Sequence, residues 1–298
     1  MIRLDGVFAP VVTPFDRNGA VDADAFAANI TAHLAAGLHG IVVAGSTGEA
    51  ALLDEDERAA LIARAREAIP ADRLLLVGTG AESTRTVIAR NAVAAELGAD
   101  GVLVVAPHYY GDAMTAEALR EHYVRIADES AVPVLLYTIP KYMHFALPAE
   151  VVAELARHEN IVGMKDSSGD AALLRGYLAS QGESFKVLTG SGSLLADALT
   201  MGAHGAILAV ALFAPLLSLD VWRAARSGRL DDWTAPQARL TPLAARIVGG
   251  MGVAGVKAAL DAVGLHGGAP RPPLRPLGPA ALDTVRTLVQ TAELATTR

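Results

Sequence analysis

Lysine is scarce in this chain, and one lysine closes an apolar run. The segment IVGMK ends at Lys165, whereas the other three lysines are Lys141, Lys186 and Lys257. Apolar surroundings favour the uncharged form of an amine, which can attack a ketone and form a Schiff base. A lysine in such a place can also extend toward solvent, or pair with a carboxylate such as Asp166. Both interpretations fit the position alone.

A Schiff-base enzyme also needs a group that moves a proton at the reacting carbon. Tyr137 ends the apolar run VLLYT in VLLYTIP, so its position is like that of Lys165. A phenol beside a positively charged iminium can both donate and accept a proton. A lone buried tyrosine is more often structural, with its hydroxyl satisfied by one partner.

A third candidate is the glycine-rich segment AGSTGEA, which begins at Ala44. Consecutive backbone N–H groups between Gly45 and Gly48 can hold a carboxylate, and Ser46 and Thr47 add hydroxyl donors. A Gly-Ser-Thr-Gly sequence is also common in ordinary turns. The segment lacks the lysine of a phosphate-binding P-loop, and no Gly-x-Gly-x-x-Gly pattern occurs elsewhere. Both interpretations fit this segment, and the candidate substrate contacts within it are Ser46, Thr47 and Gly48.

Composition argues against several other kinds of protein. The chain has no cysteine, and its eight histidines form no His-x-x-x-His pair, so a metal site is not expected. A net charge of -7 argues against a nucleic-acid or anionic-membrane surface. The N-terminus lacks the pattern of a signal peptide, so a cytoplasmic protein is expected. An uncharged stretch between Asp197 and Asp220 is interpreted as a buried strand, a turn and a helix.

Short apolar runs alternate with longer segments of helical periodicity along most of the chain. Eight runs are predicted to be strands, and they begin at Gly6, Gly40, Leu74, Gly101, Val132, Ile161, Lys186 and Gly205. Continuous apolar strands are typical of a parallel sheet that is covered on both faces. The pattern predicts an α/β fold of the closed (β/α)₈ type, a TIM barrel, with a doubly wound open sheet as the main rival.

The chain continues past the eighth predicted strand into further helices. Residues 1–225 are predicted to form the barrel, and residues 226–298 a small helical appendage packed on it. Within the appendage, the Gly- and Pro-rich segment 264–279 is predicted to be an irregular connector before the last helix. In a barrel of this kind, catalytic groups gather where the C-terminal ends of the strands meet the following loops. Lys165 and Tyr137 fall at such ends. Lys186 opens a strand at the opposite face, Lys141 is expected in a loop, and Lys257 in an appendage helix.

The ordered motifs GSTGE, PHYY, YTIP and GMKDSSGD resemble the superfamily of dihydrodipicolinate synthase and N-acetylneuraminate lyase. The similarity extends over nearly the whole chain. It implies a (β/α)₈ barrel that binds pyruvate as a Schiff base, needs no metal or organic cofactor, and assembles as a homotetramer, a dimer of dimers. The implied partners are a small 2-oxo acid, namely pyruvate, and an aldehyde.

The resemblance also implies roles for individual positions. Lys165 matches the Schiff-base lysine, Tyr137 the proton-relaying tyrosine, and Ser46 the hydroxyl of that relay. Further matches are the carboxylate-binding residue, the aromatic side chain exchanged between subunits, and two positions that line the pocket: Thr47, Tyr110, Gly190 and Ile207.

Two departures from the family pattern bear on the substrate. Dihydrodipicolinate synthases carry an arginine five residues after the relay tyrosine, and this chain has Tyr142 there, beside Lys141. A tyrosine cannot form the bidentate contact of a guanidinium with a carboxylate. Neuraminate lyases carry acidic residues after the glycine of strand seven, and here Gly190 is followed by Ser191, Gly192 and Ser193. These motifs are most similar to those of 4-hydroxy-2-oxoglutarate aldolases and related 2-keto-3-deoxy-acid enzymes.

The expected function is therefore that of a Schiff-base aldolase that forms or cleaves a 2-oxo acid with pyruvate as one component. Alternatives are 4-hydroxy-tetrahydrodipicolinate synthase of lysine biosynthesis, a dehydratase of keto-deoxy sugar acids, and a non-catalytic sensor of keto acids. The sequence leaves the aldehyde and the direction of the reaction undecided.

Overall fold

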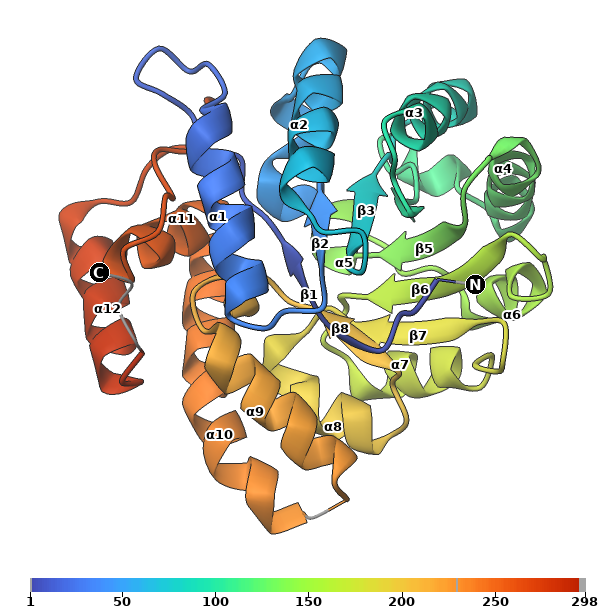
Figure 1. The fold of residues 1–298 in the computed structure, drawn as a ribbon. Helices are drawn as coiled ribbons and strands as arrows, with labels where there is room; N and C mark the ends of the chain where they lie inside the picture. Colours follow the sequence, from blue (N-terminus) through green and yellow to red (C-terminus); the bar gives the residue numbers. More distant parts are fainter. Residues whose placement is uncertain (1, 229, 295–298) are drawn as a thin grey trace.

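The strands of this protein close into one parallel barrel. The computed structural model describes residues 2–228 and 230–294. Each strand pairs with its neighbours in chain order, and β1 pairs with β8 to close the ring (Figure 1). The strands are β1 Gly6–Pro10, β2 Gly40–Val43, β3 Leu74–Gly78, β4 Gly101–Val105, β5 Val134–Thr138, β6 Ile161–Asp166, β7 Lys186–Thr189 and β8 Gly205–Ile207. All eight predicted strands are present, and the alternative of an open sheet was wrong.

Helices surround the barrel and connect its strands (Figure 1). They are α1 Ala23–Ala35, α2 Glu55–Ala68, α3 Thr84–Glu96, α4 Ala116–Glu129, α5 Pro140–Met143, α6 Ala149–Leu155, α7 Ala171–Leu178, α8 Leu195–Thr200 and α9 Pro215–Arg226. Asp54 caps α2 in a reciprocal capping box with Glu57. Gly37 and Gly98 follow α1 and α3 with φ of 97° and 86°, a backbone conformation that glycine adopts without strain.

Two apolar layers hold the barrel together. Side chains alternate along each strand between the barrel interior and the space under the helices. In β5, Leu135 and Tyr137 point into the interior, whereas Val134 and Leu136 pack in the outer layer. Because the side-chain period is two, Lys165 and its neighbour Asp166 must face opposite layers. The fold thereby separates the two charged side chains at the end of β6.

A C-terminal group of helices lies beside the barrel, shown in orange and red in Figure 1. It comprises α10 Leu230–Pro242, a π-helical segment η6 Leu243–Met251, α11 Gly252–Ala262 and α12 Pro279–Thr291. α10 packs against α9, and α11 contacts the loops that follow β2 and β8. Residues 229 and 295–298 of the predicted appendage lie outside the described residues.

Two segments are long enough and apolar enough to be compared with a membrane span. The uncharged stretch between Asp197 and Asp220 contains the end of α8, then β8, the short 3₁₀ helix η5 (Ala209–Leu212) and the start of α9, as predicted. The helical run Asp232–Ala262 is long and apolar enough to cross a membrane by length and composition, and core helices of globular proteins pass the same test. This run includes η6, and Gly252 interrupts it with φ of 62°.

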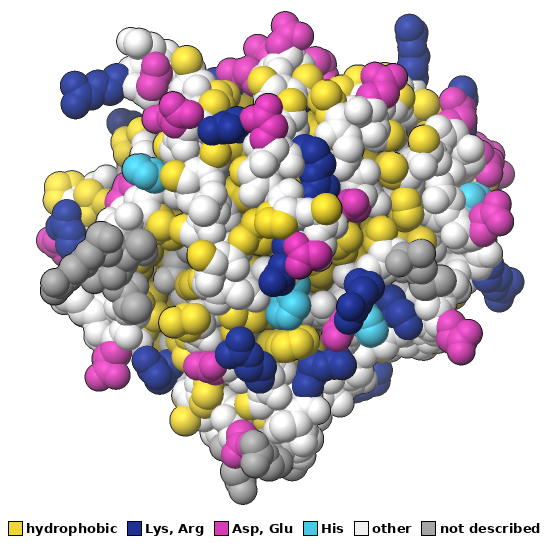
Figure 2. All heavy atoms as spheres, viewed as in Figure 1, with side chains coloured by type: hydrophobic (Ala, Val, Ile, Leu, Met, Phe, Trp, Pro, Cys, Tyr) yellow, Lys and Arg dark blue, Asp and Glu magenta, His cyan; other side chains and the backbone are white. Residues whose placement is uncertain are grey.

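The face of the molecule shown in Figure 2 carries charges of both signs, interspersed with apolar side chains. This mixed distribution accompanies the negative net charge of -7. The face shown therefore has no extended patch of a single sign.

Candidate active site

Lys165 and Tyr137 are neighbours across adjacent strands. Tyr137 of β5 pairs in register with Lys165 of β6, and the Nζ atom of Lys165 lies 4.5 Å from the centroid of the Tyr137 ring. Both side chains are buried, at 7% and 4% exposure. The amine forms no ion pair with Asp166, whose carboxylate instead accepts hydrogen bonds from the N–H and hydroxyl of Ser168 at 2.9 and 3.0 Å. Burial raises the pKa of Asp166.

Gly190 and Ile207 lie at the ends of the next two strands around the ring and line the same cavity. Gly190 follows β7, and its N–H donates to the carbonyl of Asp166 at 2.6 Å. A Cβ atom at Gly190 would overlap the Ser167 hydroxyl and lie 2.9 Å from Cε of Lys165. Glycine is therefore required here because the Ser167 and Lys165 side chains both lie directly beside the backbone.

The glycine-rich segment forms a 3₁₀ turn, η1 Ser46–Gly48, followed by a second, η2 Ala50–Leu52. The first N–H groups of a helical turn have no partner within it. Among the described residues, no hydrogen bond from the N–H of Ser46 or Thr47 is found, and both residues line the cavity. These two amides are the ones that the turn leaves available to a ligand.

Gly48 was expected to contact substrate, but it does not line the cavity. Its N–H donates to the carbonyl of Gly45 at 3.0 Å. Its own carbonyl accepts a hydrogen bond from the Thr13 hydroxyl at 2.7 Å, and a Cβ atom at Gly48 would lie 2.9 Å from the carbonyl oxygen of Val11. Gly48 thus serves the packing of the turn, since its amide is already used.

A buried ion pair holds the far side of this turn. Glu49 follows Gly48 in a left-handed conformation with φ of 59°. Its carboxylate lies 2.5 Å from Nζ of Lys257 on α11, and neither side chain has any exposed surface. Lys257 also donates to the carbonyl of Ala269 at 3.0 Å. Burial lowers the pKa of Lys257, and the hydrogen bond with Glu49 acts in the opposite direction.

Arg271 extends the same contact network into the connector that follows α11. Its backbone N–H donates to Glu49 at 2.7 Å, and its guanidinium forms two bonds of 2.6 Å with Glu57 of α2. The guanidinium and Lys257 both lie over the ring of Phe15, at 4.1 and 4.5 Å from its centroid. Because Glu49 immediately follows η1, these contacts tie the Ser46–Thr47 turn to the C-terminal helices.

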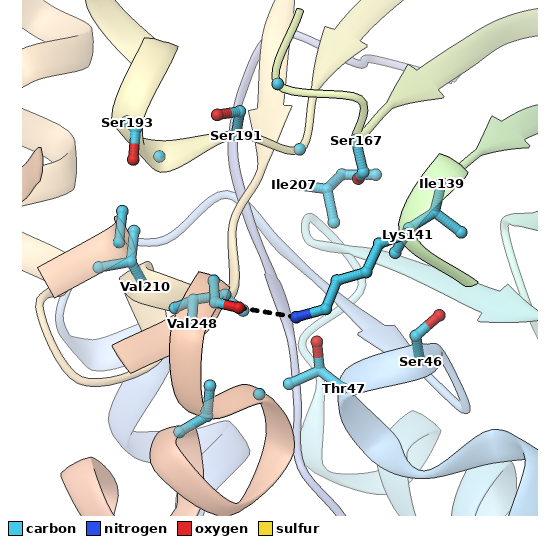
Figure 3. Close-up of a pocket in the computed structure, with 18 of the residues that line it drawn as sticks. Ser46, Thr47, Ile139, Lys141, Ser167, Ser191, Ser193, Ile207, Val210 and Val248 are labelled. Atoms are coloured by element: carbon cyan, nitrogen blue, oxygen red, sulfur yellow. Dashed lines mark hydrogen bonds between the residues drawn. The ribbon is translucent and has the colours of Figure 1, made fainter. Parts of the chain in front are cut away.

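The candidate catalytic residues Lys165, Tyr137 and Ser46 line a cavity of about 290 Å³. Its wall is formed partly by the ends of the strands and partly by η6 and the start of α11. Figure 3 shows Ser191 and Ser193 on one side, Ser46 and Thr47 on the other, and Lys141 between them. Together with Ser167, these residues give the cavity several hydroxyl groups.

Lys141 was predicted to lie in a loop, but it lies in the short helix α5. Its Nζ atom donates to the carbonyl of Gly249 in η6 at 2.7 Å, so the side chain crosses from α5 to the C-terminal helices (Figure 3). Tyr142, next to it, also lines the cavity. Burial, followed by proximity to Tyr137, raises the pKa of Tyr142.

Tyr110 is not brought to this cavity within a single chain. It lies at the start of η3 Gly111–Ala113, is 69% exposed, and its ring contacts that of Tyr109 edge to face. Glu82 orders the preceding loop by accepting hydrogen bonds from the N–H groups of His108 and Tyr109 at 2.8 and 2.9 Å.

A second and larger cavity of about 670 Å³ adjoins the first and shares Ser46, Tyr137 and Tyr142 with it.

Sequence reasoning placed Lys165, Tyr137, Ser46, Thr47, Gly190 and Ile207, which the structure brings around one cavity. It missed the network of Glu49, Lys257 and Arg271. A signal was present, because Lys257 interrupts the otherwise apolar segment GVAGVKAAL, and a lysine on a buried helix face requires a partner. Within residues 2–228 and 230–294, no group of three His, Asp or Glu side chains lies close enough to hold a metal ion.

The chain is similar to known proteins over nearly its whole length. The model of the dihydrodipicolinate synthetase family matches residues 3–292. A 4-hydroxy-tetrahydrodipicolinate synthase of Exiguobacterium is 34% identical over 93% of this chain and 94% of its own length. An uncharacterized DapA-like lyase of Halobacterium salinarum is 38% identical over 93% of this chain and 90% of its own length.

Solved structures show the same architecture. The dihydrodipicolinate synthase of Acinetobacter baumannii, solved in complex with pyruvate, superposes with a TM-score of 0.93 at 28% identity, covering 98% of this chain and 99% of that one. Since the family model and both relatives cover nearly all of the chain, the chain belongs to the dihydrodipicolinate synthetase family, whose members are carbon–carbon lyases of the class I aldolase type.

Proposed function

We propose that this protein is a Schiff-base enzyme that makes or breaks a carbon–carbon bond between pyruvate and an aldehyde. The observation that carries the proposal is the placement of the Lys165 amine 4.5 Å from the Tyr137 ring, inside a cavity that the Ser46–Thr47 turn also lines. These are a nucleophile, a proton carrier and a set of carboxylate donors, which a 2-oxo acid requires together.

The first step is formation of the Schiff base. The carboxylate of the 2-oxo acid docks on the amides and hydroxyls of Ser46 and Thr47, which places its ketone at Lys165. The amine attacks the carbonyl carbon, and the resulting carbinolamine loses water to leave an iminium. No metal or organic cofactor takes part.

The second step breaks the bond between C3 and C4. The C4 hydroxyl gives its proton to Tyr137, which passes a proton on toward Ser46, while the electron pair of the C3–C4 bond moves into the iminium. An aldehyde leaves and an enamine remains on Lys165. A proton returned to C3 and hydrolysis of the iminium release pyruvate and restore the amine. Condensation follows the same steps in reverse.

Borohydride trapping tests this assignment. Reduction in the presence of pyruvate is expected to fix an adduct on Lys165, located by mass spectrometry of peptides. Tyr137→Phe should still form the trapped adduct while turnover falls about 100-fold or more, since a positioned acid–base group contributes at least that much. An adduct on another lysine, or no adduct, would exclude the mechanism.

Two aldehyde partners have separate support. The names of relatives such as the Exiguobacterium protein favour aspartate semialdehyde and the reaction of 4-hydroxy-tetrahydrodipicolinate synthase. Tyr142 at the arginine position, and the absence of an acid from Gly190 to Ser193, favour an aldolase of 4-hydroxy-2-oxoglutarate or 2-keto-3-deoxy acids. A coupled assay with aspartate semialdehyde, beside a panel of these acids read by released pyruvate, decides between them.

If the intact iminium instead loses a proton from C3, the enamine so formed still carries C4 and can expel the C4 hydroxide as water. The enzyme would then be a dehydratase, and product analysis on the panel detects this outcome. A keto-acid sensor would bind pyruvate without exchanging its methyl protons, which NMR in deuterated water detects.

For the assembly, we propose a homotetramer in which Tyr110 of one chain completes the proton relay of its neighbour. Support comes from the exposure of Tyr110.

A further inference from the structure

The charges around the catalytic cavity are unbalanced. Among the described residues that line it are two cations, Lys141 and Lys165, and no aspartate or glutamate. Lys165 must be uncharged when it attacks the ketone. Lys141 therefore supplies the lasting positive charge of this cavity, in a chain whose net charge is -7.

Lys141 is held in place by a neutral partner. Its Nζ atom donates to the carbonyl of Gly249 at 2.7 Å, and within the described part of the chain it has no carboxylate partner. An ammonium group has three donors, so this bond leaves two of them available. The side chain is exposed, and it lies 5.8 Å from the centroid of the Tyr142 ring.

Hydroxyl groups surround the remainder of the space. Figure 3 shows Ser167, Ser191 and Ser193 beyond Lys141 and opposite the Ser46–Thr47 turn. Their side-chain hydroxyls form no hydrogen bond with other residues in the described parts of the chain, so they too are available to a ligand. The cavity thus has the proposed carboxylate site at the Ser46–Thr47 turn, the hydroxyls of Ser191 and Ser193 on the other side, and the Lys141 amine between them (Figure 3).

We propose that Lys141 binds a second carboxylate, so that the substrate is a dicarboxylic 2-oxo acid with a hydroxyl at C4. This inference rests on the proposed function and narrows its substrate class. The first carboxylate occupies the Ser46–Thr47 turn, the ketone reacts with Lys165, and the distal carboxylate receives charge-assisted hydrogen bonds from Lys141. The aldehyde that leaves then itself carries a carboxylate.

The test compares two ligands that differ at the distal group. 2-Oxoglutarate carries the second carboxylate, whereas 2-oxopentanoate ends in a methyl group at the corresponding carbon. Each is measured by its competition with pyruvate for borohydride trapping on Lys165. The wild-type protein should bind 2-oxoglutarate at least about tenfold more tightly, as expected for a hydrogen bond to a charged group.

Substitutions at Lys141 assign that preference. Lys141→Met should remove the preference for 2-oxoglutarate and leave the affinities for 2-oxopentanoate and pyruvate within about twofold, while Lys141→Arg should retain it. Lys186→Met is the matched control, because Lys186 is a half-buried lysine outside this cavity whose Nζ also donates to a backbone carbonyl, that of Gly182, at 2.7 Å. It should leave all three affinities unchanged.

Each result has a defined meaning. Equal weakening of both ligands by Lys141→Met would show that Lys141 only joins α5 to η6, and would overturn the inference. A wild-type protein without a preference for 2-oxoglutarate would overturn it as well. Failure of pyruvate trapping on Lys165 in the wild type would instead reject the proposed function, so the two failures are distinguishable.

Discussion

The position of the Lys165 side chain depends on its small neighbours. The side chain passes Gly190 so closely that any Cβ there would lie 2.9 Å from its Cε atom. Contacts of that length force one of the two groups to move. Because catalysis depends on the position of the amine to within about 1 Å, the absence of a side chain at Gly190 is part of the site.

Gly190→Ala tests this dependence. The added methyl group should displace the Lys165 side chain and lower kcat/KM about 100-fold, since misplacement by about 1 Å has costs of that size. The rate of borohydride trapping with pyruvate should fall with it. Both are measured on protein whose circular dichroism matches the wild type.

Gly182→Ala is the control for this substitution, because a Cβ atom at Gly182 meets nothing within 4 Å. It should leave trapping and turnover unchanged. Wild-type trapping by Gly190→Ala would show that the Lys165 side chain has another route to the cavity.

Among the elements, the turn η1 depends on contacts from a distant part of the sequence. Glu49 and Arg271 are 222 residues apart, yet the backbone N–H of Arg271 donates to the Glu49 carboxylate. Lys257 contributes the other contact from α11. A carboxylate with no exposed surface is stable only while such partners are present.

Lys257→Met should therefore leave Glu49 as an uncompensated buried charge and lower the free energy of unfolding by about 3–5 kcal/mol. Adding Glu49→Gln should recover part of this loss, because the double variant has no unpaired charge. Denaturant unfolding of both single variants and the double variant completes the cycle. Losses that simply add would show that the two side chains do not stabilise each other.

Helix α1 contributes a sensitivity to acid. His33 is fully buried, its Nε2 atom has no hydrogen-bond partner, and burial lowers its pKa from 6.5 to about 4. Between these values the unfolded chain binds a proton that the folded chain does not, so stability falls as pH drops from 6.5 toward 4. The difference between the two pKa values corresponds to a decrease of roughly 3 kcal/mol in the free energy of unfolding. This decrease is nearly complete at pH 4.

His33→Leu should flatten this part of the stability curve, measured as the free energy of unfolding between pH 7 and pH 4. The exposed His266 provides the control substitution, His266→Leu, which should leave the slope as it is in the wild type. A wild-type slope in His33→Leu would assign the acid sensitivity to other groups, such as the buried His122, whose pKa is also lowered to about 4 by burial.

At the scale of the whole molecule, the catalytic cavity lies between the barrel and the C-terminal helices. Strand ends provide Lys165 and Tyr137, whereas η6 and α11 provide the opposite wall. The adjoining cavity of about 670 Å³ shares Tyr137 with it and is lined mainly by apolar side chains. The proposed substrate site therefore lies where two parts of the fold meet, as is common for small-molecule sites.

The role expected of Tyr110 requires an assembly, because its side chain would act in the site of a second chain. Tyr110 is 69% exposed in the single chain, a high exposure for a large aromatic residue. If the proposed tetramer is correct, light scattering should give four times the chain mass of 30.8 kDa. Tyr110→Ala should reduce kcat, and Tyr110→Phe should separate loss of the hydroxyl from loss of the ring. A monomeric wild type with full activity would contradict the proposal.

The sequence by itself determined the barrel and the placement of Lys165 beside Tyr137 at its strand ends. Eight apolar runs alternate with helical segments, and a lysine and a tyrosine at the ends of two runs must meet at the same edge, because parallel strands end together. The capping box of Asp54 with Glu57 and the glycines after α1 and α3 were also predictable. These features are local, so neighbouring residues suffice to specify them.

Tertiary structure decided the rest. It gave Gly48 a packing role, placed Tyr110 outside the single-chain cavity, moved Lys141 into a helix that bonds to η6, and paired Glu49 with Lys257. Each of these outcomes depends on which distant segments closure of the barrel brings into contact. No local pattern carries that information, because the partners are set by packing across the whole chain.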